Sequence, residues 1–324
     1  MKTFTDVLLD RMRQVGDEPA DQLIQSTIAP LPKAILQQWM QFLTHTRVEW
    51  PTFLPQQVRQ FFKAVQLPEW VDTAKLEKGS RFFQQQQARI LFLLGTYSLP
   101  YCYAAAKGVK VLYLSERIQK DTYNRLQETA TFIETMMQPQ VLEKPEGLIN
   151  CTKVRLLHAT IRYFTLKHAQ WDNTWGTPIN QEDMAGTNLA FSYIILRGLR
   201  KMKVNYTPQE AESYLYTWRV IGHLLGVDER LAAENRQQAY WLDKMIAKRQ
   251  FAPSKEGALL TKALIDLFEE QHYLLGKIGT NQMRFLLGDT LANALRVPHY
   301  NYTRMMIPLV QIQNFTQSLF KKAS

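Results

Sequence analysis

The 324-residue sequence lacks most of the short motifs that mark well-known enzyme classes. It has no Gly-x4-Gly-Lys-Ser/Thr phosphate loop, no Gly-x-Gly-x-x-Gly dinucleotide motif, no His-Glu-x-x-His zinc motif and no Gly-x-Ser-x-Gly nucleophile motif. A Cys-x-x-Cys-His haem-attachment motif and a paired Glu-x-x-His set for a di-iron bundle are also absent. These absences argue against nucleotide-driven, zinc-dependent and serine-hydrolase chemistry, and against covalently attached haem.

Cysteine is scarce, with only Cys102 and Cys151 in the chain. Both lie in apolar surroundings and form neither a metal-spaced pair nor a disulfide framework, which is typical of buried thiols in a reducing compartment. Residues 1–20 mix acidic, basic and apolar side chains, whereas a signal peptide has a basic start and an apolar core. The sequence therefore predicts a cytoplasmic protein.

Long apolar runs are also missing. The longest, Ile90–Ala106, is broken by Pro100. About 20 consecutive apolar residues are needed to cross a bilayer. We therefore expect a buried core helix with a kink or break near Pro100 rather than a membrane span.

The charge is strongly basic, with a formal net charge of +10 and a pI near 9.5. Lysines and arginines are scattered, and the densest groups, within residues 197–203 and at Lys321-Lys322, are small. No groove-lining basic stripe is visible, so we do not expect a nucleic-acid partner. A basic surface could instead aid peripheral contact with an anionic membrane.

Helical periodicity dominates the chain, and no pair of alternating strands joined by a hairpin dipeptide is found. The loops at 138–150 and 168–180 are too short and too apolar for domain linkers. The sequence thus predicts one all-α domain over residues 1–324. Helices are expected near residues 4–14, 33–44, 55–65, 73–87, 88–97, 101–107, 121–137, 152–165, 181–200, 208–225, 230–247, 254–270, 280–291 and 301–322.

The segment 152–162 carries the strongest candidate site. On a helix, Arg155, His158 and Arg162 share one face at spacings of three and four. Two flanking cations penalise an imidazolium and so keep His158 neutral, as a metal ligand must be. The arginines would also suit haem propionates. The alternative is a partly buried histidine beside arginines that reach solvent or a carboxylate.

Three further segments place polar groups on core-facing helices. In 121–132, Arg125, Glu128 and Thr129 form a polar patch, or Arg125 and Glu128 simply make an exposed ion pair. In 176–187, Asn180 is placed as a helix N-cap, and Thr187 would face the interior. Segment 218–228 contains Arg219 and His223, which we interpret first as polar core residues.

A non-covalent haem is the metal centre that asks for the fewest protein ligands, since one neutral histidine and an apolar helical pocket suffice. In order, the chain segments Leu91–Tyr101, Arg125–Thr129, Val154–Arg162, Pro178–Asp183 and Trp218–Gly222 resemble the domain shared by latex-clearing proteins and MpaB-type oxygenases. The resemblance covers about residues 88–230.

The resemblance implies an all-helical fold around a buried pocket for b-type haem, with His158 as the iron ligand and with Arg155, Arg162 and Thr187 beside the cofactor. The family's distal Arg-x-x-Lys-Thr stretch falls on Arg125, Glu128 and Thr129, so that Glu128 replaces the lysine. The acid used as a base in the family cannot be placed, with Glu116 as one candidate.

Three functional hypotheses follow. The first is a haem b-dependent oxygenase that uses dioxygen on a small apolar substrate, which by the resemblance would be an unsaturated isoprenoid or a lipid. The second, suggested by Glu128 in place of lysine, is a haem- or lipophile-binding helical protein without turnover. The third is a helical interaction module without a cofactor, supported only by the basic charge.

Overall fold

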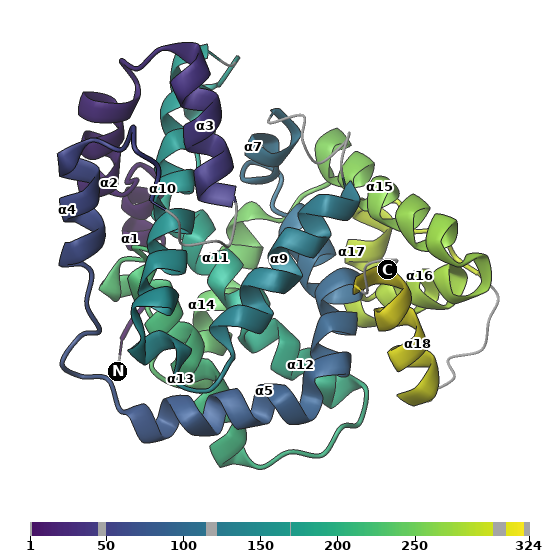
Figure 1. Ribbon diagram of the computed structural model, residues 1–324. Helices are drawn as coiled ribbons and strands as arrows, with labels where there is room; N and C mark the ends of the chain where they lie inside the picture. The colour runs from purple at the N-terminus through teal and green to yellow at the C-terminus, as the bar shows by residue number, and fades with distance from the viewer. Residues whose placement is uncertain (1, 45–49, 115–121, 169, 301–308, 321–324) are drawn as a thin grey trace.

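The computed structural model describes residues 2–44, 50–114, 122–168, 170–300 and 309–320 and confirms the all-α prediction (Figure 1). In these ranges no strand is formed, and Ala105 and Phe251 make one isolated bridge. The helices are α1 Asp6–Arg13, α2 Glu18–Leu23, α3 Lys33–Thr44, α4 Gln56–Ala64, α5 Thr73–Leu93, α6 Leu99–Tyr103, α7 Val109–Leu114, α9 Thr122–Met136, α10 Pro145–His168, α11 Gln181–Phe191, α12 Tyr193–Lys201, α13 Pro208–Leu224, α14 Arg236–Gln250, α15 Lys255–Gln271, α16 Tyr273–Leu287, α17 Asp289–Ala294 and α18 Leu309–Phe320.

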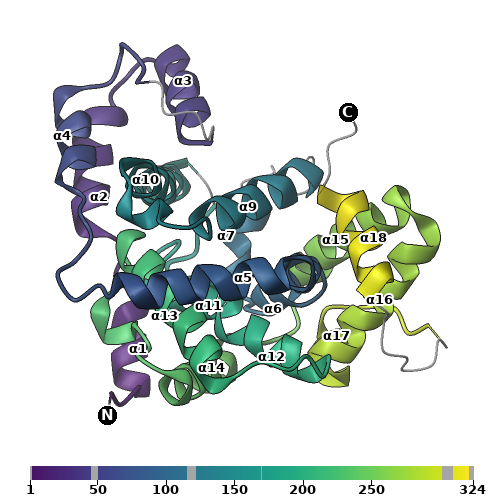
Figure 2. The same cartoon turned by 60° about the horizontal axis from the view of Figure 1, so that its bottom comes forward.

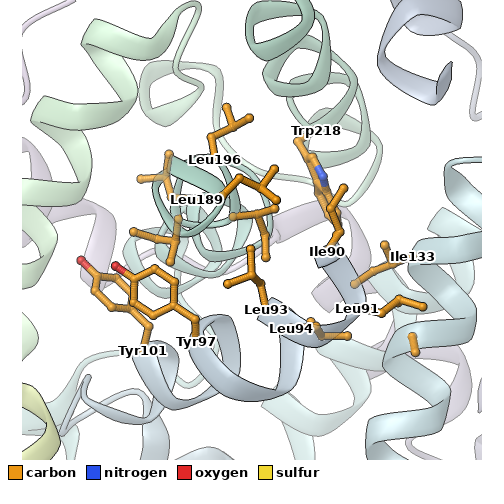
Figure 3. Packing of buried hydrophobic residues seen from close by; sticks show 14 of the residues in the cluster. Ile90, Leu91, Leu93, Leu94, Tyr97, Tyr101, Ile133, Leu189, Leu196 and Trp218 are labelled. Carbon is orange, nitrogen blue, oxygen red and sulfur yellow. The ribbon is translucent and has the colours of Figure 1, made fainter. Parts of the chain in front are cut away.

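The apolar run 90–106 lies in the core and bends where proline predicts it. Helix α5 continues without interruption through residues 87 and 88, where we expected two helices, because no helix breaker stands there. A π-helical turn, Leu94–Ser98, then leads into α6, whose second residue is Pro100. Figure 3 shows Leu93 and Tyr97 packed toward Leu189 and Leu196. Across the described ranges, no helix is long and apolar enough to span a bilayer.

Several predicted boundaries were wrong for local reasons. Helix α10 begins at Pro145, seven residues before the expected start, because proline fits the first turn of a helix. The expected helix 181–200 is broken at Ser192 into α11 and α12. The expected helix 280–291 starts earlier, as α16, and ends before Gly288, which has φ +80°. The predicted start of the last helix lies outside the described residues.

The apolar interior forms two clusters on either side of α10. The larger one surrounds α5, α13 and α15. The smaller one lies between α10 and the N-terminal helices α2, α3 and α4, and includes Trp39, Phe42 and Leu156. In Figure 2, α10 is seen end-on with α2, α3 and α4 around one side of it. Trp39 Nε1 donates to Thr160 Oγ1 at 3.0 Å within this cluster. Helix α10 therefore links the N-terminal helices to the rest of the domain.

Candidate functional site

A cavity of about 870 Å³ lies among α10, α9, α11 and α14, and most of its lining is apolar. Its size and character fall in the range of small-molecule and cofactor sites, which are mainly apolar with a few placed polar groups. The cavity contacts most of the sequence-predicted candidates. It is therefore the first place to look for function.

One stripe of α10 forms a wall of this cavity. The lining side chains recur at helical spacing and include Asn150, Val154, Leu157, His158, Ile161 and Thr165. With about 100° between successive residues, the stripe covers roughly half of the helix, and His158 stands at its edge. The other side of α10 packs against the N-terminal helices. The sequence of this helix thus serves two different interfaces.

His158 is positioned as a neutral imidazole facing the cavity. Its Nδ1 is buried and meets no hydrogen-bond partner among the described residues, and the residue lines the cavity. Burial, with smaller contributions from the positive charges of Arg162 and Arg125, lowers the pKa of His158 to about 4. Of the two cations that were expected to keep the imidazole neutral, Arg162 contributes and Arg155 does not, and burial is the larger cause.

Arg155 and Arg162 do not reach the cavity. They lie about 40–60° further round α10 than His158, beyond the edge of the lining stripe. Arg155 makes a two-pronged ion pair with Asp17, at 2.5 and 2.8 Å. Arg162 pairs with Asp21 and donates to the carbonyl oxygen of Pro178 at 3.0 Å. The structure therefore places both guanidinium groups toward carboxylates, as in the alternative interpretation, and not toward a ligand in the cavity.

Arg125, Glu128 and Thr129 all line the cavity from α9. Arg125 Nη1 and Glu128 Oε2 are 3.0 Å apart, and both side chains are about one-third exposed or less. The Thr129 hydroxyl donates to the backbone carbonyl of Arg125 at 2.9 Å. The ion pair foreseen as an exposed surface contact thus lies on the cavity wall. The Glu116 candidate lies outside the described residues.

Thr187 also lines the cavity, from α11. Asn180 caps this helix as predicted, with Oδ1 accepting from the Asp183 amide at 2.9 Å. The Asp183 carboxylate accepts from Arg13 at 2.9 Å and faces the cavity, and burial raises its pKa. His223 and Arg219 lie outside this cavity and are half-buried against the ring of Trp70, whereas we interpreted them as polar core residues.

A polar cluster beside the cavity was not predicted from the sequence. Asp243 accepts from the Tyr101 hydroxyl at 2.7 Å, and its other carboxylate oxygen lies 3.2 Å from Arg197 Nη1. Burial raises the pKa of Asp243. These residues come from α14, α6 and α12, so no spacing in the sequence could connect them. Lys153 was missed too, although its place in the α10 stripe was a usable signal.

Comparisons with known proteins agree with this architecture. Residues 87–312 match the family described as ER-bound oxygenase mpaB/B'/Rubber oxygenase, catalytic domain, which extends past the region 88–230 that carried the resemblance. The chain is 26% identical over 265 residues to the rubber oxygenase of Streptomyces sp. (strain K30), covering 79% of this chain and 64% of that protein. It thus spans less than two thirds of that relative's length.

A solved structure of latex clearing protein in the closed state has the same fold, with a TM-score of 0.81 and 22% sequence identity. The superposition covers 95% of this chain and 90% of the other. The family match alone takes in well over half of the 324 residues. The chain therefore belongs to the family of MpaB-type and rubber oxygenase catalytic domains.

Proposed function

We propose that this protein is a haem b-dependent oxygenase that acts with dioxygen on an apolar, unsaturated isoprenoid or lipid. The observation that carries the proposal is His158, a neutral histidine with one buried, unpartnered ring nitrogen, at the edge of a large apolar cavity. Membership of an oxygenase family supports the same function.

The residues on the cavity wall fit a non-covalent haem. One neutral histidine and an apolar helical pocket meet its requirements. His158 Nε2 would hold the iron, and Arg125, which lines the same cavity, would pair with a carboxylate group of the cofactor. A bound haem would supply the redox chemistry by which dioxygen attacks a carbon–carbon double bond. The protein's own part is to hold His158 neutral, exclude water and orient the substrate.

The substrate class is inferred from the lining. A cavity with mainly apolar walls favours an apolar molecule, because burying apolar surface is favourable while unmatched polar groups are costly to desolvate. The name of the Streptomyces relative indicates an apolar, unsaturated polymer as its substrate. For this chain we propose a smaller molecule of the same chemistry, such as a lipid or a terpenoid, in keeping with the size of the cavity.

The second candidate is a haem- or lipophile-binding protein without turnover. It is favoured by one observation, the ion pair between Arg125 and Glu128 on the cavity wall. In rubber-cleaving relatives a lysine is expected at the position of Glu128, so this chain has exchanged a cation for an anion there. A neutralised ion pair stabilises negative charge that develops in the transition state less than a lone cation would.

Absorption spectroscopy tests the cofactor. Purified wild type, as isolated and after adding hemin, should show a Soret band from stoichiometric haem. His158→Ala should lose the band or shift it. The matched control is His223→Ala, which removes a half-buried histidine outside the cavity and should leave the spectrum unchanged. Absence of any band in wild type with added hemin would refute the haem proposal.

Oxygen consumption then separates the two candidates. The haem-loaded protein should consume dioxygen when given unsaturated apolar compounds and not when given their saturated counterparts. Stoichiometric haem with no consumption across such compounds would instead assign the protein to the binding function. Substitution of Glu128 by Gln tests the role of the ion pair, because it removes the negative charge while keeping the side-chain shape.

A further inference from the structure

Helix α14 has an exposed face that is aromatic and basic. Its exposed residues recur at spacings of three and four and are Gln237, Tyr240, Trp241, Lys244 and Lys248, which we call the outer α14 face. None of them is acidic, and the single carboxylate of the helix, Asp243, is buried. The exposed face of α14 is therefore aromatic and basic, and no carboxylate lies on it.

The two aromatic rings are held in place rather than loose. Tyr240 and Trp241 are 42% and 44% exposed, and their rings pack edge-to-face with centroids 5.0 Å apart. The ammonium group of Lys244 lies over the Trp241 ring, 5.0 Å from its centroid. Large exposed rings with polar edges beside lysines are the side chains found where proteins meet the interface of a membrane.

The neighbouring helix α12 is also basic. It contains no acidic residue, and Arg200 is exposed at its end, whereas the ammonium group of Lys201 donates to the Leu286 carbonyl at 2.6 Å. Helices α12 and α14 pack together, and Figure 2 shows them side by side along the lower edge of the molecule. The basic aromatic surface therefore covers two helices.

We propose that the outer α14 face, together with the exposed end of α12, docks onto an anionic phospholipid membrane. The lysines and arginine complement the negative headgroups, and the two rings insert at headgroup level. A stable protein interface buries about 800 Å² per partner, with apolar residues at its centre, whereas two half-exposed rings among lysines offer much less. Nucleic acid is disfavoured because the surface is a convex helix face and not a groove.

The outer α14 face lies on the helix that also forms part of the cavity wall. The opposite side of α14 contributes Asp243 and Ile246 to the wall of the cavity. A docked bilayer would thus lie about one helix diameter, roughly 10 Å, from the cavity lining. An apolar substrate of the kind proposed above dissolves in membranes. The docking inference itself does not depend on haem or on turnover, and it can be tested without either.

The first test is cosedimentation with lipid vesicles. Wild type should bind vesicles of phosphatidylcholine containing about one-third phosphatidylserine, bind phosphatidylcholine alone much less, and dissociate at high salt. Lys244→Gln combined with Lys248→Gln should weaken binding roughly 30-fold, because each lysine near an anionic surface contributes about fivefold. Tyr240→Ser combined with Trp241→Ser should weaken binding to both kinds of vesicle.

The matched control is Lys33→Gln combined with Lys63→Gln, which removes the same charge from exposed positions on α3 and α4. These helices lie on the other side of the molecule in Figure 2. The control should bind as wild type does. Equal losses in both double variants would show that only net charge matters and would overturn the proposal, as would a wild type that binds neither kind of vesicle.

A fluorescent label reports which face touches the lipid. Burial raises the pKa of both native thiols, Cys102 and Cys151, to about 12, so a thiol-reactive dye should react mainly at an introduced Gln237→Cys. The dye emission should shift to the blue on adding anionic vesicles. No shift at position 237 while the protein sediments would overturn the proposal. So would dimerisation through Trp241 without lipid, which would assign the face to a second copy.

Discussion

Arg162 donates from Nη2 to the backbone carbonyl of Ile179 at 2.9 Å and so ties the helix that carries His158 to the loop before α11. Ile179 has φ +50°, a left-handed conformation that is costly for a β-branched residue. Its side chain lines the cavity. The guanidinium group of Arg162 was expected to contact a cofactor. It instead holds the strained backbone of Ile179, which forms part of the cavity wall.

Replacing Arg162 by Met should lower the free energy of unfolding by about 3 kcal/mol, since it leaves Asp21 and two carbonyl groups without their buried partner. Urea-induced unfolding would measure the change. Arg230→Met is the control, because its ion pair with Asp228 is exposed and local, and it should cost less than about 1 kcal/mol. Equal costs for both variants would contradict this assignment.

The stability of the apo-protein should fall with acid in a window set by His158. Its folded-state pKa is about 4, below the ordinary value of 6.5. Between these values the unfolded chain binds a proton that the folded chain does not, so stability drops by about 1.4 kcal/mol per pH unit as the pH falls through the window. Above pH 6.5 the group contributes no slope.

His158→Gln should remove this slope. Buried carboxyl groups with raised pKa values, such as Asp183 and Asp243, change stability in the opposite direction, but they are common to both proteins. The difference between the two unfolding curves over pH 4–6.5 therefore isolates the histidine. Parallel curves would mean that His158 is free to take up a proton in the folded state.

The hydrogen bond between Trp39 and Thr160 should matter for the attachment of the N-terminal helices. Thr160→Val keeps the volume but leaves the buried indole N–H without an acceptor, which should cost about 1–3 kcal/mol. Thr160→Ser keeps the hydroxyl and should cost less. Thermal unfolding of the three proteins would rank them, and a valine variant as stable as the serine variant would contradict the prediction.

Lys203 offers a stabilising change. It follows α12 with φ +57°, and the amide of Val204 donates to the Leu199 carbonyl at 2.9 Å, as in a helix end that favours glycine. Lys203→Gly should raise the free energy of unfolding by about 0.5–1 kcal/mol, because glycine adopts this conformation without steric cost. Lys203→Ala should bring no gain, and calorimetry would distinguish the two variants.

Much of the site could be predicted because it is local. The spacing of Arg155, His158 and Arg162 within α10 follows from helical geometry, and so does the cap formed by Asn180. The π-helical turn that precedes Pro100 lies where the chemistry of proline predicts a disturbed helix. Each depends on residues only a few positions apart, which is the range over which backbone geometry fixes side-chain positions.

The sequence by itself determined the helical fold class, the helical spacing that places His158 beside Arg162, and the family pattern that runs through residues 88–230. The tertiary structure decided which side of α10 faces a cavity, and that Arg155 and Arg162 face Asp17 and Asp21 instead. It also decided that Asp243 and Tyr101, which line the cavity, contact each other, and that Asp243 pairs with Arg197. Asp17 and Arg155 are 138 positions apart. Helical periodicity shows that a side chain points inward, but only the packing of distant helices determines what it meets there.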